Sequence, residues 1–267
     1  SDVYKRQSYG FSNALWAILC VSVIIFLTGL PISYYTAKYG IDMDLLTRGA
    51  GFGYIGSTIT SLIYASFTFI FFALEASIMA QAVQMAFGIP LAWGYVLCSL
   101  VVIPLVIHGV TVISRVQAWT QPIWLVLMAL PFVAVLWQEP ELPARLMQYT
   151  AGAPEGAHFD WLLFGSAATV AFSLIAQIGE QVDYLRFLPN ETRENRRRWW
   201  TALLLAGPGW VFMGTLKMLG GALLAILVID HGIEVTHALE PTQMYLVAFG
   251  YVFSDPRWIA GAVALFV

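Results

Sequence analysis

One carboxylate, Glu75, stands in the middle of an apolar segment, FFALEASIMAQ. A charge at the centre of a bilayer costs about 2.5–3.5 kcal/mol, so such a residue should face protein or a water-filled cavity. Helical spacing places Phe71 or Phe72 on the same stripe as Glu75. An aromatic ring beside a carboxylate suits a planar, cationic or hydrogen-bonding ligand. The alternative is that Glu75 is protonated, or paired with another helix, and only holds the helices together.

A second set of polar residues recurs at intervals of 3, 4, 4 and 3 along the apolar segment 161–185: Ser166, Thr169, Ser173, Gln177 and Glu180. This spacing gives one polar face on a helix that is otherwise apolar. We expect that face to line a cavity or a contact with another helix. Gly179 within it indicates an unwound point of the kind that transporters use at binding sites. The alternative for the serines and the threonine is a hydrogen bond to their own helix backbone.

Lys217 interrupts a third apolar segment, 200–229. It could pair with Glu75 or Glu180 and so offset the cost of burying both charges. It could also extend its charged end towards the membrane surface.

The composition indicates an integral membrane protein. The chain is 59% hydrophobic and 11% charged, with a mean hydropathy of +0.74, whereas a soluble domain is usually about 25% charged. Cys20 and Cys98 each lie in apolar runs, which favours buried small side chains over a disulfide or a metal site. The sequence contains no nucleotide loop, metal cluster, nucleophile–base pair or nucleic-acid module, so we expect neither an enzyme nor a nucleic-acid-binding protein.

The apolar runs predict an all-α membrane domain. A spanning helix needs about 20 apolar residues, and six runs qualify: 11–37, 57–87, 92–113, 118–137, 161–185 and 200–229. A further one begins near Trp258, and 241–253 suits a helix at the membrane surface or over a cavity. Residues 1–7 look like a non-native or disordered leader. We expect residues 8–267 to be a permease-like domain that is truncated at both ends.

Loop charges predict the orientation. The loop 186–198 carries five arginines against two glutamates, which by the positive-inside rule places it in the cytoplasm of a multi-pass protein of a bacterial inner membrane. Trp199 and Trp200 follow it, and we interpret them as anchors at the membrane interface.

Two motifs resemble those of the nucleobase–cation symporters, the purine-cytosine and hydantoin permease group. YGIDMDLLTRGAGFGYIG is similar to the loop between that family's second and third helices, and GEQVDYLRF is similar to the end of its sixth. Asp183 and Arg186 match an Asp and an Arg of the family, and we expect structural or gating roles for them and for Lys217.

The resemblance implies a LeuT-type fold with inverted repeats, of which this chain holds helices 2–7 and the start of helix 8. It also implies substrate-binding positions, which fall on Phe71, Glu75, Phe172, Leu174 and Glu180. The family's Gln is replaced by Glu75 and one Trp is lost, which favours a cationic or protonatable ligand or proton coupling. A coupling ion, Na⁺ or H⁺, would have its ligands outside this chain, and no covalently bound cofactor or metal site is expected.

The segments ALEASIMA and IAQIGEQVDYLRFLP also resemble permease-like input domains found in front of bacterial histidine kinases, including hybrid sensor kinases. Two functions therefore follow. The first is a transporter that moves a small solute by alternating access, with Phe71 and Glu75 facing Ser173, Gln177 and Glu180. The second is a sensory domain that binds the solute and signals to a cytoplasmic kinase domain in the same chain.

Overall fold

The described part of the chain is helical throughout. The structure, a computed structural model, describes residues 10–150, 158–233 and 240–266, and no strand occurs among them. Five stretches of these residues are long and apolar enough to cross a membrane: Gly10–Tyr39, Met43–Phe87, Thr111–Gln138, Trp161–Leu185 and Arg196–Asp230. Many of their large apolar side chains are exposed, as lipid-facing residues would be. The prediction of an all-α membrane protein is confirmed at this level; the predicted leader, 1–7, lies outside the described residues.

The structure gives five spanning stretches where the sequence predicted six. The predicted span 92–113 is wrong in its bounds, because α5 (Leu91–Ile107) ends before Gly109 and α6 (Val110–Gln138) begins after it. Gly109 has a φ of 79°, a left-handed conformation that suits glycine and turns the chain. α5 is therefore a shorter apolar helix that falls below the length of a full span.

The chain divides into two compact units, and each is described by itself. Residues up to Phe69 together with Met147–Leu219 form unit 1, and Ile70–Leu146 together with the residues from Gly220 onwards form unit 2. Two long helices, α4 (Gly53–Phe87) and α11 (Trp210–Asp230), each contribute to both units.

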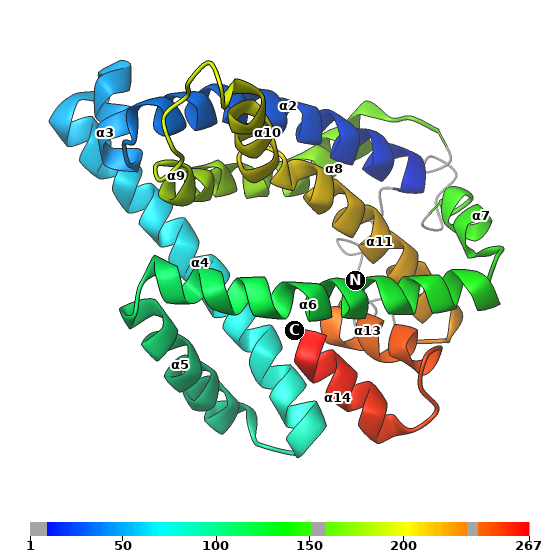
Figure 1. Cartoon of the computed structure of the whole chain (residues 1–267). Coiled ribbons are helices and arrows are strands. Elements are labelled where there is room, and N and C mark those ends of the chain that lie inside the picture. The colour runs from blue at the N-terminus through cyan, green and yellow to red at the C-terminus, as the bar shows by residue number, and fades with distance from the viewer. Residues whose placement is uncertain (1–9, 151–157, 234–239, 267) are drawn as a thin grey trace. The chain divides into compact units, whose positions relative to one another are not determined.

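Unit 1 is built on α2 (Gly10–Tyr39), which lies along α8 (Trp161–Phe172) (Figure 1). The two helices approach closely because their contact is made of small side chains, among them Ala17, Ala168 and Ala171. At one end of this pair, buried Asn13 of α2 donates to the carbonyl of His158 (3.0 Å) and accepts from the backbone N–H of Asp160 (2.8 Å). Asp160 in turn caps α8 by accepting from two backbone N–H groups of its first turn.

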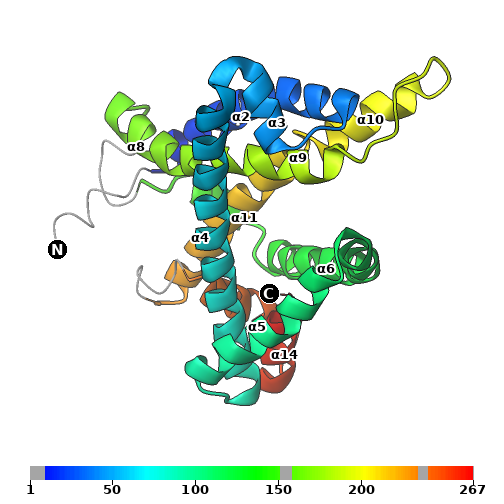
Figure 2. The same ribbon diagram turned by 90° about the vertical axis from the view of Figure 1, so that its left-hand side faces the viewer.

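The other end of α2 packs against α9 (Glu180–Leu185) and α10 (Arg196–Ala206), which lie side by side (Figure 2). Trp199 is buried here at 3% exposure and donates its indole N–H to the carbonyl of Pro189 (2.8 Å). Its interpretation as an interfacial anchor is therefore wrong. An indole can satisfy its only polar group within a core, and the sequence does not reveal that partner.

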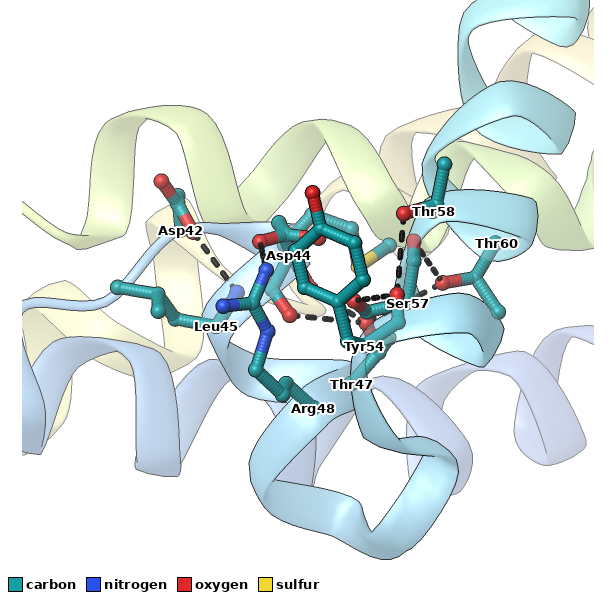
Figure 3. Close-up of polar contacts among 10 residues, drawn as sticks. Asp42, Asp44, Leu45, Thr47, Arg48, Tyr54, Ser57, Thr58 and Thr60 are labelled. Carbon is teal, nitrogen blue, oxygen red and sulfur yellow. Dashed lines mark hydrogen bonds and ion pairs between the residues drawn. The ribbon is translucent and has the colours of Figure 1, made fainter.

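The glycine-rich segment after α2 forms a compact polar turn in unit 1. Asp42 caps α3 (Met43–Thr47) by accepting from the N–H of Leu45 (2.9 Å), and a π-helical turn, η1 (Arg48–Phe52), leads into α4 (Figure 3). Arg48 pairs with Asp44 and lies over the ring of Tyr54, with 4.9 Å between guanidinium carbon and ring centroid. These contacts account for the charged residues of this loop without a ligand.

Unit 2 contains the second part of α4, α5, α6, α13 (Pro241–Gly250) and α14 (Pro256–Phe266). α5 folds back along α4, where Gly94 lies against Ala80 and Tyr95 donates to the hydroxyl of Ser77 (3.2 Å). α13 packs on α14 and α6 with Phe249 fully buried, so it belongs to the packed interior of this unit. The short helix α7 (Leu142–Met147) follows α6.

Candidate solute-binding site

The stretch Trp161–Leu185 changes helix type where the polar stripe lies. α8 is followed by a 3₁₀ segment, η3 (Ser173–Gly179), and then by α9. Ser173, Gly179 and Glu180 all keep right-handed helical backbone angles, so the helix tightens at this point and does not unwind. The sequence predicted the place of the irregularity correctly and its nature wrongly. A 3₁₀ segment inside a long helix often marks a functional hinge or local strain.

Gly179 is required by packing. A Cβ atom at this position would lie 2.6 Å from two ring carbons of Tyr64 and 3.0 Å from the methyl group of Met43. The Tyr64 ring therefore packs directly on the backbone at the end of η3, and its hydroxyl donates to Asp183 (2.9 Å). Asp183 thus connects α9 to α4, and its expected structural or gating role stays a prediction.

Three residues of the predicted stripe satisfy their hydroxyl groups locally. Ser166 donates to the carbonyl of Leu162 (2.8 Å), Thr169 to that of Gly165 (2.8 Å) and Ser173 to that of Val170 (2.7 Å). All three side chains are exposed. For these residues the alternative of a bond to their own backbone holds, and none of them lines the cavity described next.

A cavity of about 420 Å³ lies in unit 1, and we call it the Glu180 cavity. Four residues singled out from the sequence line it: Leu174, Gln177, Glu180 and Lys217. The others come from α2, α8, α9 and α11: Val21, Ser22, Ile25, Ala171, Tyr184, Trp210, Val211, Met213, Gly214 and Met218. Its volume falls in the range of small-molecule sites, about 300–1,000 Å³. The lining combines an apolar wall with a few polar groups, as such sites do.

Hydrogen-bond directions show what Ser22 offers to this cavity. Its oxygen lies 2.6 Å from the hydroxyl oxygen of Thr215, which donates its only proton to the carbonyl of Val211 (2.8 Å). Ser22 is therefore the donor to Thr215, and its own lone pairs can accept a bond from a ligand. Ser22 was not predicted as a site residue, and its one signal is that it is a lone serine in the apolar run LCVSVIIF.

The remaining predicted residues lie elsewhere. Phe172 packs against the α2–α8 core, and the Arg186 guanidinium carbon lies 4.9 Å from the ring centroid of Phe187. Phe71, half-buried, and Glu75, exposed, belong to α4 within unit 2. Their predicted meeting with Gln177 and Glu180 of unit 1 stays a prediction.

Unit 2 contains a contrasting cluster, which we call the Arg145 network: Gln138, Glu139, Arg145, Asp230, His231 and Tyr251. Arg145 bridges Glu139 (2.8 Å) and Asp230 (3.4 Å). The Tyr251 hydroxyl lies 3.3 Å from a carboxylate oxygen of Glu139 and 3.4 Å from Nε2 of His231. These contacts join the ends of α6, α7, α11 and α13.

Two further contacts complete the Arg145 network. Gln138 donates to the backbone carbonyl of Tyr251 (2.8 Å), and Nδ1 of His231 lies 2.8 Å from the carbonyl of Leu227. Burial and the negative charge of Glu139 raise the pKa of the Tyr251 phenol. The network is therefore held together by mutually paired groups.

A comparison of the chain with models of known protein families, with curated proteins and with solved structures found no match. Within the described ranges, no three His, Cys, Asp or Glu side chains gather as a metal site would require. The family resemblance is thus carried by the sequence motifs alone, and the geometry of the Glu180 cavity is an independent observation.

Proposed function

We propose that this chain is a permease-like domain of a bacterial inner membrane that binds a small solute in the Glu180 cavity. The observation that carries the proposal is this cavity, which Gln177, Glu180 and Lys217 line together with apolar residues of membrane-length helices. Charged residues within such helices usually mark a substrate or ion pathway.

The helices around the cavity suit a solute site. η3 contributes Gln177 and ends next to Glu180, so a change of helix type adjoins two lining residues. Irregular helix segments near ligand sites are common in transporters. In the transporter of the LeuT type implied by the motifs, movement around η3 and Gly179 would open and close the cavity by alternating access.

The test is ligand-induced thermal stabilisation of the full-length protein in detergent. The compounds are purines, pyrimidines, hydantoins, amines and amino acids, with and without sodium, at two pH values. We expect at least one compound to raise the Tm of the wild type. Gln177→Leu should abolish that shift because it removes the amide from the cavity. Ser166→Ala, on the same stretch but outside the cavity, should keep it. A panel without any shift, or a shift that survives Gln177→Leu and Glu180→Gln, would contradict the proposal.

The sensory alternative is favoured by the segment IAQIGEQVDYLRFLP, which contains Gln177 and Glu180. The same cavity would then bind the solute without moving it. Uptake of a radiolabelled ligand into proteoliposomes separates the two functions, because a transporter accumulates the ligand and a sensor only binds it.

A further inference from the structure

We infer that the ligand of the Glu180 cavity is a zwitterion with an apolar substituent, of the α-amino acid class. The inference rests on the proposed function and names its substrate class. It starts from one juxtaposition: Glu180 of α9 and Lys217 of α11 line the same cavity. The sequence left three possibilities open for Lys217, and the structure places it in the lining of the same cavity as the acid of the polar stripe.

Opposite charges that line one cavity favour a ligand that carries both. Glu180 and Lys217 are themselves exposed, so the expected selectivity comes from matching the two charges and not from burying them. A ligand with only an ammonium group would meet Glu180 but bring a second positive charge near Lys217, and a ligand with only a carboxylate would do the reverse. A zwitterion adds no net charge and provides each side chain with a counter-charge.

Both side chains already have interactions within the protein. A ligand must therefore replace or supplement those interactions. A singly charged compound can provide a counter-charge for only one of the two residues, whereas a zwitterion provides one for each. The expected selectivity for a zwitterion follows from this second counter-charge.

The neutral lining residues complete the match. The oxygen of Ser22 retains lone pairs that can accept from an ammonium group, and the Gln177 amide can donate to a carboxylate. The rest of the wall is apolar and sulfur-containing, with Val21, Ile25, Leu174, Trp210, Met213 and Met218. A branched or aromatic substituent would be buried against it.

Three compounds that share an isobutyl group test the inference. Leucine carries both charges, isopentylamine only the ammonium group and 4-methylpentanoate only the carboxylate. By isothermal titration calorimetry on the full-length protein in detergent, we expect leucine to bind about thirtyfold tighter, or more, than either analogue, because each analogue leaves one charge unmatched. An analogue that binds within about threefold of leucine would overturn the inference.

Two variants assign the charges. Glu180→Gln should weaken leucine binding and reduce the ratio of the 4-methylpentanoate Kd to the leucine Kd. Lys217→Met should reduce the ratio of the isopentylamine Kd to the leucine Kd. Ser166→Ala is the matched control and should leave all three Kd values unchanged. If a variant does not fold, the wild-type series still decides the question.

The outcomes separate this inference from the proposed function. One contrary result is that nucleobases or amines bind in a Gln177-dependent manner while leucine shows no preference. That result would contradict the zwitterionic ligand class and would still support the Glu180 cavity as a solute-binding site. A protein that binds neither these three compounds nor any of the wider panel would contradict both.

Discussion

The Glu180 cavity of unit 1 and the Arg145 network of unit 2 use similar side chains in opposite ways. In the network, Arg145 contacts the carboxylates of Glu139 and Asp230, and the Tyr251 hydroxyl contacts Glu139 and His231. These polar groups therefore satisfy one another. In the cavity, Glu180 and Lys217 line a space of about 420 Å³ among apolar residues. Both clusters border a cavity: the one beside Gln138, His231 and Tyr251 has a volume of about 390 Å³. Of these two cavities, the Glu180 cavity is the one lined by both an acidic and a basic side chain, and for this reason we propose it as the binding site.

The largest expected effect on stability is at Gly179, which positions the cavity. Gly179→Ala places a methyl group against the Tyr64 ring and should lower the free energy of unfolding by about 1–3 kcal/mol, the usual cost of overpacking. It should also weaken leucine binding, because Glu180 follows directly in the chain. Thermal unfolding in detergent and calorimetry measure the two effects.

Gly165→Ala is the matched control, because nothing lies within 4 Å of an added Cβ there and the residue is in α8 of the same stretch. It should be neutral or slightly stabilising, since alanine favours a helix over glycine by up to about 1 kcal/mol. Equal stability of the two variants would show that Tyr64 does not pack on Gly179 in the way described.

The two clusters should differ in their effect on leucine binding. Lys217→Met removes a charged group from the cavity lining and should impair leucine binding. Arg145→Met breaks two ion pairs and should lower the free energy of unfolding by up to about 1 kcal/mol, a modest value because Arg145 is 43% exposed. Leucine binding should be unchanged in Arg145→Met. Calorimetry and denaturation curves of both variants measure these effects, and unimpaired leucine binding by Lys217→Met would remove the distinction between the clusters.

The smallest effect concerns alkaline pH in the Arg145 network. Because burial and Glu139 raise the pKa of Tyr251, the folded protein favours the neutral phenol. The stabilisation is fully present below the pKa of an unfolded tyrosine, about 10, and is lost as the pH rises through the folded value. Tyr251→Phe should therefore flatten the fall of Tm as the pH rises above about 10. A wild-type profile as flat as that of the variant would contradict the assignment.

The sequence was sufficient to predict the elements whose signal is local. Long apolar runs gave the helices, and Gly179 marked the irregular part of its helix. The boundary at Gly109 was missed because the apolar run continues on both sides of it. Turn geometry there depends on one backbone angle that composition does not specify.

The site was only partly predictable, for a different reason. Gln177 and Glu180 lie in the cavity as expected, but Ser166 and Ser173 share their spacing and bond to their own helix. Short hydroxyl side chains can reach a carbonyl one turn back, whereas longer polar side chains extend away from the helix. Residues with the same helical spacing can therefore have different hydrogen-bonding partners. Ser22 and Trp210 were missed because only the packing of α2 and α11 around η3 makes them neighbours.

Ligand protection of a single cysteine tests the central claim most directly. With exposed Cys20 replaced by serine and buried Cys98 kept, Met213→Cys puts a reactive thiol in the cavity lining, and Arg197→Cys puts one at an exposed, charged position outside it. The rate of N-ethylmaleimide labelling is measured with and without leucine at a concentration that saturates binding by calorimetry. We expect leucine to slow labelling at position 213 and to leave labelling at position 197 unchanged. Equal labelling rates at position 213 with and without bound leucine would show that the ligand does not occupy the Glu180 cavity.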